Sequence, residues 1–286
     1  MKTETKNKEK SSKRRILTFS LIAFLVLIVL LIFVDLIISN FTLRTTEYYI
    51  ENYKINKEIR IVQISDLHEK NFGKDNKKLI EEICEASPDL IVFTGDIIER
   101  TSKDDPTEYL TNLLQKLRDV APVYFCLGNH EESSPYFQVF KDTVSRNGAT
   151  LLDDSYTDIS IKGQNIRIGA LSYYRSWYVD HHRFLKDFSD TENFTLLLCH
   201  YPEYYVWGVK RYSIDLMLSG HTHGGMIRLP FMGGLYAPEQ GWFPECDKGL
   251  FDDENATIII SAGLGSSPSY MPRFFNPPEI VSVTIN

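Results

Sequence analysis

The sequence predicts an α/β protein with layered secondary structure, preceded by one apolar helix at the N-terminus. Two observations support this prediction. Apolar runs with the length of strands alternate with amphipathic helical segments from about residue 59 onward. Before them, residues 16–34 carry no charge and contain only two polar side chains. The chain of 286 residues is 43% hydrophobic and 24% charged, which is typical of a globular protein and excludes a disordered one.

The apolar run is interpreted as a membrane-spanning helix. Its 19 residues would extend about 28 Å as a helix, close to the thickness of the hydrocarbon core of a bilayer. A core helix is rarely apolar on all sides over five turns. A cleaved signal peptide has a shorter apolar region that ends at a small-x-small site, and residues 35–40 (DLIISN) contain none. We therefore expect an anchor, with the core helix and the signal peptide as alternatives.

Charge predicts the orientation of this anchor. Residues 1–15 contain seven basic and two acidic residues, and Lys13, Arg14 and Arg15 directly precede the apolar run. Basic residues stay on the cytoplasmic side, so the N-terminus is expected in the cytoplasm and the bulk of this single-pass chain outside the membrane. The expected organisation is a basic cytoplasmic tip (1–15), a transmembrane helix (16–38), a short linker (39–45) and one domain (46–286).

The domain begins with three strands that alternate with three helices. The strands are expected at residues 59–65, 90–94 and 123–127, and the helices at 76–86, 106–117 and 134–146. The second helix shows the clearest pattern, because its leucines recur at helical spacing. The order β-α-β-α-β-α predicts a layered α/β fold.

The second half of the domain is richer in strands. They are expected at residues 159–161, 166–171, 194–199, 214–218, 257–261 and 280–285. The sequence KGQN at 162–165 is a turn signal that predicts a hairpin between the first two. The chain has no internal repeat and no flexible linker after residue 16, so one domain of about 240 residues fits better than two.

Charge and cysteine content exclude other classes of protein. The formal net charge is −7, and the chain beyond residue 15 carries −12, which argues against a general nucleic-acid binder because such proteins need a basic face. The four cysteines are too far apart in the sequence to predict a metal site. Cys126 and Cys199 lie in strand-like runs and are expected to be buried, and whether any pair with Cys84 or Cys246 forms a disulfide stays open.

Metal-ligand side chains follow five of the predicted strands. These tips are Asp66-Leu67-His68, Gly95-Asp96, Gly128-Asn129-His130-Glu131, His200 and Gly220-His221-Thr222-His223. In open α/β sheets, sites form beyond the carboxyl ends of the strands, so the five tips can converge. Five of the seven histidines lie there, a concentration that scattered structural histidines would not produce. The other two, His181-His182 near Trp177 and Tyr178, suggest an exposed loop or the lining of a substrate entrance.

Taken in this order, the five tips resemble the calcineurin-like metallophosphoesterase family over residues 46–286. More narrowly, the chain resembles the bacterial membrane-associated branch, which includes cell-wall-associated and UDP-2,3-diacylglucosamine pyrophosphatase-like phosphoesterases. The matching stretches are SDLH (65–68), FGKDN (72–76), GHTHGG with RLP (220–230), GLG (263–265) and RFFNPPEI (273–280). The resemblance implies a four-layer αββα sandwich that holds two divalent metal ions.

The resemblance also implies a role for each residue. One metal ion would be held by Asp66, His68, Asp96 and His223, and the other by Asp96, Asn129, His200 and His221. This mixture of imidazole and oxygen ligands suits Mn, Fe or Zn better than Mg. A water activated between the ions would attack phosphorus, and His130 would assist the leaving group.

Several further residues are weaker candidates. Glu99 stands where the family commonly has an aspartate beside that histidine, and it could equally be a surface carboxylate at a helix start. Arg100 and Arg273 are candidates for binding phosphate, or are simply solvated. Residues 226–251 are rich in glycine and aromatic residues and could form a cap over lipid or sugar groups, or an irregular packed loop.

The expected function is that of a membrane-anchored phosphoesterase acting on a phosphodiester, phosphomonoester or pyrophosphate. A short linker would keep the site near the bilayer, which favours a lipid- or envelope-linked substrate. The alternatives are a phosphodiesterase of small soluble nucleotides and a non-catalytic binding scaffold of the same fold. The scaffold is disfavoured because every ligand position is filled, and a nuclease is disfavoured because the domain is acidic.

Overall fold

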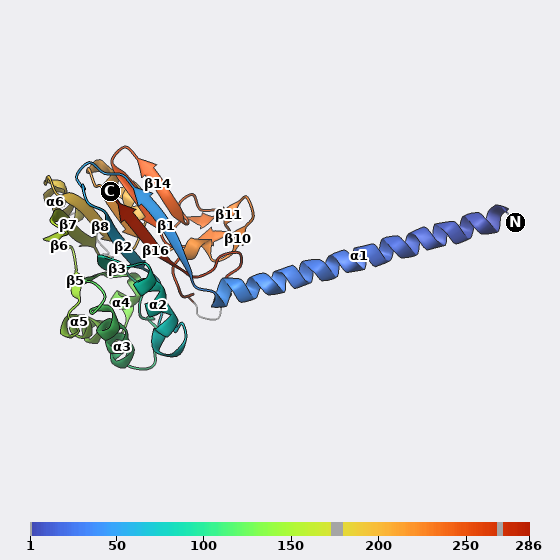
Figure 1. Cartoon of the computed structure of the whole chain (residues 1–286), viewed down its shortest axis with the longest axis horizontal. Coiled ribbons are helices and arrows are strands. Elements are labelled where there is room, and N and C mark those ends of the chain that lie inside the picture. The colour runs from blue at the N-terminus through green and yellow to red at the C-terminus, as the bar shows by residue number, and fades with distance from the viewer. Residues whose placement is uncertain (1, 173–179, 268–270) are drawn as a thin grey trace.

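The computed structural model describes residues 2–172, 180–267 and 271–286. A single continuous helix, α1 (Lys2–Phe41), projects away from the folded domain (Figure 1). Its segment Lys13–Phe41 is long and apolar enough to cross a membrane by length and composition. The helix continues three residues beyond its predicted end, so only Thr42 and Leu43 separate it from the first strand.

Two mixed six-stranded sheets form the centre of the domain. The first has the strand order β1-β16-β2-β3-β4-β5, in which β16 pairs antiparallel with β2 and every other neighbouring pair is parallel. Its strands are β1 (Arg44–Ile50), β2 (Ile59–Ile64), β3 (Leu90–Thr94), β4 (Val123–Cys126), β5 (Thr150–Leu152) and β16 (Glu279–Ile285). The first and last strands of the chain are therefore neighbours in one sheet.

The second sheet has the order β14-β15-β9-β8-β7-β6, with parallel pairing at its centre and an antiparallel hairpin at each edge. Its strands are β6 (Ser155–Ile161), β7 (Gln164–Leu171), β8 (Phe194–Cys199), β9 (Leu216–Ser219), β14 (Gly249–Asp253) and β15 (Ala256–Ile260). The predicted hairpin is confirmed, because Ile161 pairs with Gln164 across a turn in which Lys162 and Gly163 both have positive φ.

Helices cover the outer face of each sheet and complete four layers. The first sheet is covered by α2 (Lys77–Glu85), α3 (Thr107–Leu117) and α5 (Phe137–Arg146), and the second by α6 (Asp180–Ser189) and α7 (Glu203–Trp207). Between the sheets lies a third apolar core, in which residues such as Ile61 and Val92 meet Leu196 and Leu218. Burial of these side chains explains why the strands are apolar on both faces. The predicted layered α/β fold is thus confirmed.

Some elements differ from the sequence prediction. The helix expected at 134–146 is α5, which begins only at Phe137, because the chain is extended at Ser134 after the short helix α4 (Asn129–Ser133). Strands β1, β5 and β14 and helices α4, α6 and α7 were not predicted. Short 3-10 helices occupy Lys74–Asn76, Val209–Arg211 and His223–Gly225.

Residues 226–251 form small irregular hairpins in place of a separate cap domain. They are built from β10 (Arg228–Leu229), β11 (Gly233–Gly234), β12 (Tyr236–Ala237) and β13 (Gly241–Trp242), before β14 begins. The cysteines of the chain are a separate point: all four are free, and Cys126 and Cys199 are buried as expected. Figure 1 shows β10 and β11 on the side of the domain from which α1 departs.

Candidate metal centre

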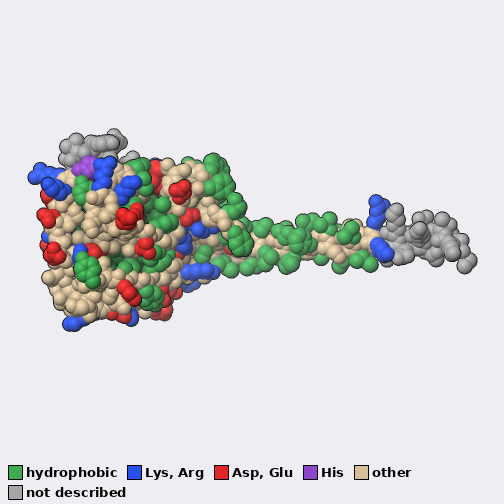
Figure 2. All heavy atoms as spheres, turned by 90° about the horizontal axis from the view of Figure 1, so that it is seen from above, with side chains coloured by type: hydrophobic (Ala, Val, Ile, Leu, Met, Phe, Trp, Pro, Cys, Tyr) green, Lys and Arg blue, Asp and Glu red, His purple; other side chains and the backbone are tan. Residues whose placement is uncertain are grey.

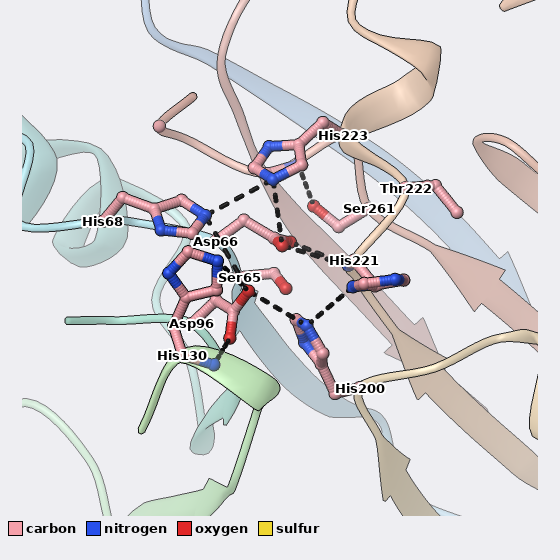
Figure 3. A network of polar contacts seen from close by, with 12 residues as sticks. Ser65, Asp66, His68, Asp96, His130, His200, His221, Thr222, His223 and Ser261 are labelled. Atoms are coloured by element: carbon pink, nitrogen blue, oxygen red, sulfur yellow. Dashed lines mark hydrogen bonds and ion pairs between the residues drawn. The ribbon is translucent and has the colours of Figure 1, made fainter. Parts of the chain in front are cut away.

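The five predicted strand tips converge at the carboxyl ends of strands from both sheets. Strands β2, β3 and β4 bring in Asp66, His68, Asp96 and the start of α4, while β8 and β9 bring in His200, His221 and His223. Figure 3 shows these side chains pointing toward one another. The backbone turns sharply at the tips, with positive φ at Asp66 (50°), His68 (48°), Asp96 (56°), His221 (69°) and His223 (49°). Such strained backbone persists where the surrounding structure fixes it, as at functional sites.

Close packing at the tips requires residues without a Cβ atom. A Cβ on Gly95 would lie 2.7 Å from Nδ1 of His200, and Gly95 itself has a φ of 88°. A Cβ on Gly128 would collide with Asp96, and one on Gly220 with Ser65 and Asp66. Glycine, which has no Cβ, permits this close approach at all three positions.

One group of metal-ligand atoms comprises Asp66, His68 and His223, all buried. Nε2 of His223 lies 3.3 Å from Nε2 of His68 and 3.6 Å from Oδ1 of Asp66. Two imidazole nitrogens that face each other and a carboxylate need a cation or a proton between them. A metal ion fits this position.

A second group comprises Asp96, His200 and His221, also buried. Nε2 of His200 lies 3.2 Å from Oδ2 of Asp96 and 3.2 Å from Nδ1 of His221. Oδ2 of Asp96 also lies 3.9 Å from Nε2 of His68 in the first group. Asp96 therefore stands between the two groups, where a bridging carboxylate would have to stand.

Asn129 gives an independent sign that a cation belongs in the second group. Its Oδ1 is buried and has no hydrogen-bond partner among the described residues. Leaving such an acceptor unpaired costs about 1–3 kcal/mol, which a metal ion would recover. With Asn129, each group contains the residue types expected of it.

Three of the histidines have their other ring nitrogen close to an acceptor, and in His200 and His221 the contact is a hydrogen bond. Nδ1 of His200 lies 2.7 Å from the Thr94 carbonyl, and Nε2 of His221 lies 2.6 Å from Glu239. Nδ1 of His68 lies 3.2 Å from Oε2 of Glu99. Such contacts place the proton on the outer nitrogen and direct the free lone pair into the centre, as in known metal sites.

The protonation states also suit metal binding. Burial raises the pKa of the Asp66 and Asp96 carboxyls, but the surrounding histidines outweigh it and lower both pKa values overall. Burial lowers the pKa of His223 to about 3, so its ring is neutral at pH 7. Burial also lowers the pKa of His200, but Asp96 and Asp66 reverse this effect and raise the pKa to about 10. The centre thus attracts positive charge strongly, and a metal ion would displace the proton from His200.

His130 forms a third buried group with His68 and Asp96, and Glu99 and Arg100 lie beside it. Nδ1 of His130 lies 2.8 Å from Oε1 of Glu99, and its Nε2 lies 3.8 Å from Oδ2 of Asp96. His130 and Arg100 both line a polar pocket of about 320 Å³, whose wall also includes Asp96 and Asn129. The structure therefore brings the predicted acid and one of the two predicted arginines to the same opening.

Arg273 is placed differently from the sequence expectation. Its guanidinium is fully buried and donates to the backbone carbonyls of His223, Ala262, Gly263, Gly265 and Asn276. All five of its N–H groups are used in this way, so none is left for a phosphate. The prediction that Arg273 binds phosphate is therefore wrong. Its guanidinium has a structural role, since it holds the loop behind His223.

Two acidic residues at the centre had no predicted role. The buried Glu131 carboxylate accepts hydrogen bonds from the backbone N–H groups of Asp96, Ile97, Ile98 and Gly128. The carboxylate caps the Gly128 N–H at the start of α4, but Gly128 lacks the hydroxyl of a capping-box Ser or Thr, so no sequence signal indicates this role. Glu239 reaches His221 from the irregular 226–251 segment, and no sequence signal indicates that contact.

His181 and His182, the two histidines outside the strand tips, lie at the start of helix α6, away from the metal centre. His181 is buried, with Nε2 3.5 Å from Asp154, and Nδ1 of His182 lies 3.1 Å from the Tyr212 hydroxyl. Neither contacts the centre. Trp177 and Tyr178 lie outside the described residues.

Comparison with known proteins is consistent with this geometry. The sequence profile of the calcineurin-like phosphoesterases matches residues 59–225. The uncharacterized metallophosphoesterase YkuE of Bacillus subtilis is 32% identical over 249 residues, covering 85% of each chain. The UDP-2,3-diacylglucosamine pyrophosphatase LpxG of Chlamydia muridarum is 27% identical over 279 residues, covering 78% of this chain and 82% of its own. Among solved structures, GAP50, the anchor in the inner membrane complex of Plasmodium, is similar in fold, with a TM-score of 0.51 and 14% identity over 79% of this chain and 81% of its own.

Proposed function

The chain belongs to the calcineurin-like phosphoesterase family, and from this premise we propose that it is a membrane-anchored phosphoesterase with two metal ions. The observation that carries the proposal is the set of three overlapping buried histidine–aspartate groups, two of which share Asp96. Asp66, His68, Asp96 and His223 would hold one ion, and Asp96, Asn129, His200 and His221 the other. Because nitrogen ligands are as numerous as oxygen ligands, Mn, Fe or Zn suits the site better than Mg.

When bound, the two ions would supply a water of lowered pKa as nucleophile and neutralise charge on the phosphoryl oxygens. The protein side chains supply the remaining steps. Nδ1 of His130 lies 2.8 Å from Oε1 of Glu99 and accepts the backbone N–H of Arg100 at 3.2 Å. These contacts fix the ring on the pocket wall, where Nε2 can protonate the leaving oxygen. Arg100, on the wall of the same pocket, can bind a phosphoryl oxygen. The reaction is hydrolysis of a phosphoester or pyrophosphate.

We further propose that α1 anchors the enzyme in a bacterial cell membrane, with its basic N-terminus cytoplasmic and the domain outside. The side chains of residues 16–34 are exposed, and a helix of this kind is stable only if lipid covers it. A site so close to the bilayer favours a lipid- or envelope-linked substrate. The name of LpxG, whose substrate carries two acyl groups, supports the same class.

The test uses the full chain in nanodiscs, stripped of metal and reloaded with Mn²⁺, Zn²⁺ or Mg²⁺. Hydrolysis of bis-p-nitrophenyl phosphate and p-nitrophenyl phosphate is followed, with metal content measured in parallel. We expect turnover that needs metal and is lost in Asp96→Asn. Two ions bound without turnover of either ester would indicate a substrate that these esters do not imitate. No bound metal would refute the catalytic proposal and favour a binding scaffold.

A further inference from the structure

A groove runs between the end of α1 and the metal centre. It has a volume of about 610 Å³. Its lining comes from α1, from the tip after β2 and from the segment before β16: Leu36, Asn40, Phe41, His68, Glu69, Lys70, Ser266, Met271 and Pro272. One end of the groove is therefore a metal ligand, and the other end is the helix that we propose to lie in the membrane.

The two ends of the groove differ in chemical character. The end at α1 is mostly apolar, since Leu36, Phe41, Met271 and Pro272 provide its surface beside the polar Asn40. The end at the centre is polar, with His68, Glu69 and Lys70. An occupant that matches this gradient has a charged group at one end and a hydrocarbon chain at the other.

The polar end adjoins the pocket in which His130 and Arg100 lie. Ser266 lines the groove, and the next residue, Ser267, lines the polar pocket. His68 forms part of the groove wall, and its ring centroid is 4.6 Å from that of His130. A molecule with its phosphate at the centre could thus extend its other end into the groove.

Hydrogen bonds hold the helix end, which forms one wall of the groove, against the domain. Asn40 exchanges two hydrogen bonds with the backbone of Arg273, at 2.9 Å each. Ser39 accepts from the backbone N–H of Asn276 at 3.1 Å, and Asp35 accepts from that of Phe275 at 2.8 Å. Lys70 donates to the backbone carbonyls of Asn40 and Leu264.

Exposed apolar residues lie on the same side of the domain. Phe231 and Met232 form the tip of the β10–β11 hairpin, which is joined to the helix contact through the hydrogen bond of Arg228 to Phe274. Phe275 is 45% exposed beside Asp35. Figure 2 shows hydrophobic side chains gathered on the face from which α1 departs. Lipid contact would cover this face and bring the mouth of the groove to the bilayer surface.

We propose that this groove binds the hydrocarbon chain of an amphiphilic phosphoester, whose phosphate lies at the metal centre while its chain runs along Leu36, Phe41 and Met271 toward the bilayer. The inference rests on the proposed function, because it specifies the substrate class of the same site. It explains why a groove open to a metal ligand is lined by residues of the membrane helix.

The first test compares two diesters with the same leaving group, ethyl and octyl p-nitrophenyl phosphate, on the Mn²⁺-loaded full chain in nanodiscs. Leu36→Trp and Met271→Trp fill the groove from opposite walls. Ile37→Trp is the control, because Ile37 is the exposed neighbour of Leu36 and does not line the groove. The octyl ester has six more methylene groups, and their burial should raise kcat/KM by at least about tenfold.

We expect the octyl-to-ethyl ratio of kcat/KM to fall at least about fivefold in both groove variants, relative to the wild type and to Ile37→Trp. Partitioning of the octyl ester into the bilayer is common to all four proteins and cancels in this comparison. Equal ratios in all four would overturn the inference and leave the proposed function standing. Hydrolysis of neither ester by the wild type with two ions bound would overturn the inference alone, and absence of bound metal would overturn both.

A second test needs neither turnover nor a folded variant. An alkyl phosphate with a photoreactive diazirine on its eighth carbon is added to the wild type in nanodiscs, and labelled peptides are identified by mass spectrometry. Labels should concentrate at Leu36, Phe41 and Met271, and excess octyl phosphate should compete them away. Labels spread evenly along α1 would show a chain dissolved in the bilayer and would contradict the groove.

Discussion

At the residue scale, Glu99 is the carboxylate that joins the metal centre to the predicted acid. Its two oxygens lie 2.8 Å from Nδ1 of His130 and 3.2 Å from Nδ1 of His68. Burial raises its pKa, but contact with these two histidines outweighs burial and lowers the pKa overall. One ionised side chain can therefore orient both rings, which a solvated surface carboxylate would not do.

Glu99→Gln should lower kcat by about 10²-fold, because the general acid loses the group that holds it. The same variant should weaken metal binding by about 10-fold or more, since His68 also loses its orienting contact. The measurements are a pH profile of kcat with saturating Mn²⁺ and a metal titration by calorimetry. Glu99→Asp is the matched variant, which keeps the charge on a shorter side chain and should retain more of both. Unchanged kcat and unchanged metal affinity in Glu99→Gln would show that Glu99 has no role at the metal centre.

Glu132, next to the centre, should make stability depend on pH. Burial raises its pKa to about 8, with Asp153 and Asp154 adding to the effect. The folded state therefore favours the protonated carboxyl. Its contribution to stability is complete below about pH 4.5, the unfolded value, and is lost as pH rises through about 8.

Glu132→Gln removes that titration. Its melting temperature with metal bound should match that of the wild type near pH 5 and exceed it at pH 9. Thermal unfolding followed by circular dichroism across this range provides the measurement. Glu85→Gln, at the exposed end of α2, controls for general loss of negative charge. A variant no more stable than the wild type at pH 9 would contradict the argument.

At the element scale, the strands and their tips could be predicted because the signals are local. An apolar strand followed by Asp, Asn or His indicates the position of a metal-ligating residue in the sequence. Parallel strands then bring these residues together at the carboxyl edge of the sheet. Glu239 could not be predicted, since it reaches His221 from an irregular segment whose path no periodicity describes. Arg273 looked like a phosphate ligand because its type binds phosphate, and only the fold shows that five carbonyls surround it.

Strand β1 shows a second limit of sequence reasoning. Residues 44–50 (RTTEYYI) alternate weakly, and their partner β16 lies at the opposite end of the chain. Pairing between the first and last strands depends on tertiary structure, which local propensity does not report. The same pairing places the helix end beside residues 273–276, next to Met271 and Pro272 of the groove wall.

The contact between α1 and the domain leads to a prediction about Asn40. In Asn40→Ala the backbone groups of Arg273 lose both partners, which should cost about 1–3 kcal/mol. The melting temperature in nanodiscs should then fall by about 3–8 °C. Ile37→Ala, on an exposed face of the same helix, should leave it nearly unchanged. Equal melting temperatures for the wild type and both variants would mean that the helix end is not held as described.

At the scale of the whole molecule, the metal centre joins the two sheets. Ligands from β2, β3 and β4 belong to one sheet, and those from β8 and β9 to the other. Binding of metal to the native state alone adds about 2.7 kcal/mol of stability when the free ion is at 100 times its dissociation constant. Chelation should therefore loosen the contact between the sheets as well as abolish activity.

Removal of metal by a chelator should lower the melting temperature by about 5–10 °C, and Mn²⁺ should restore it. Differential scanning calorimetry of the full chain in nanodiscs gives this shift. Asp96→Asn, which alters the residue shared by both groups, should show a much smaller response to metal. If the wild type melts at the same temperature with and without chelator, the ions do not contribute to folding.

Only Thr42 and Leu43 separate α1 from β1, and two residues span about 7 Å at most. With α1 in a bilayer, such a short junction fixes the distance between the metal centre and the lipid surface. Phosphates at headgroup level come within reach by lateral diffusion in two dimensions, whereas those farther out on a long polymer do not. The rate of such an enzyme follows the mole fraction of its substrate in the membrane, so diluting the bilayer with inert lipid slows it while diluting the buffer does not.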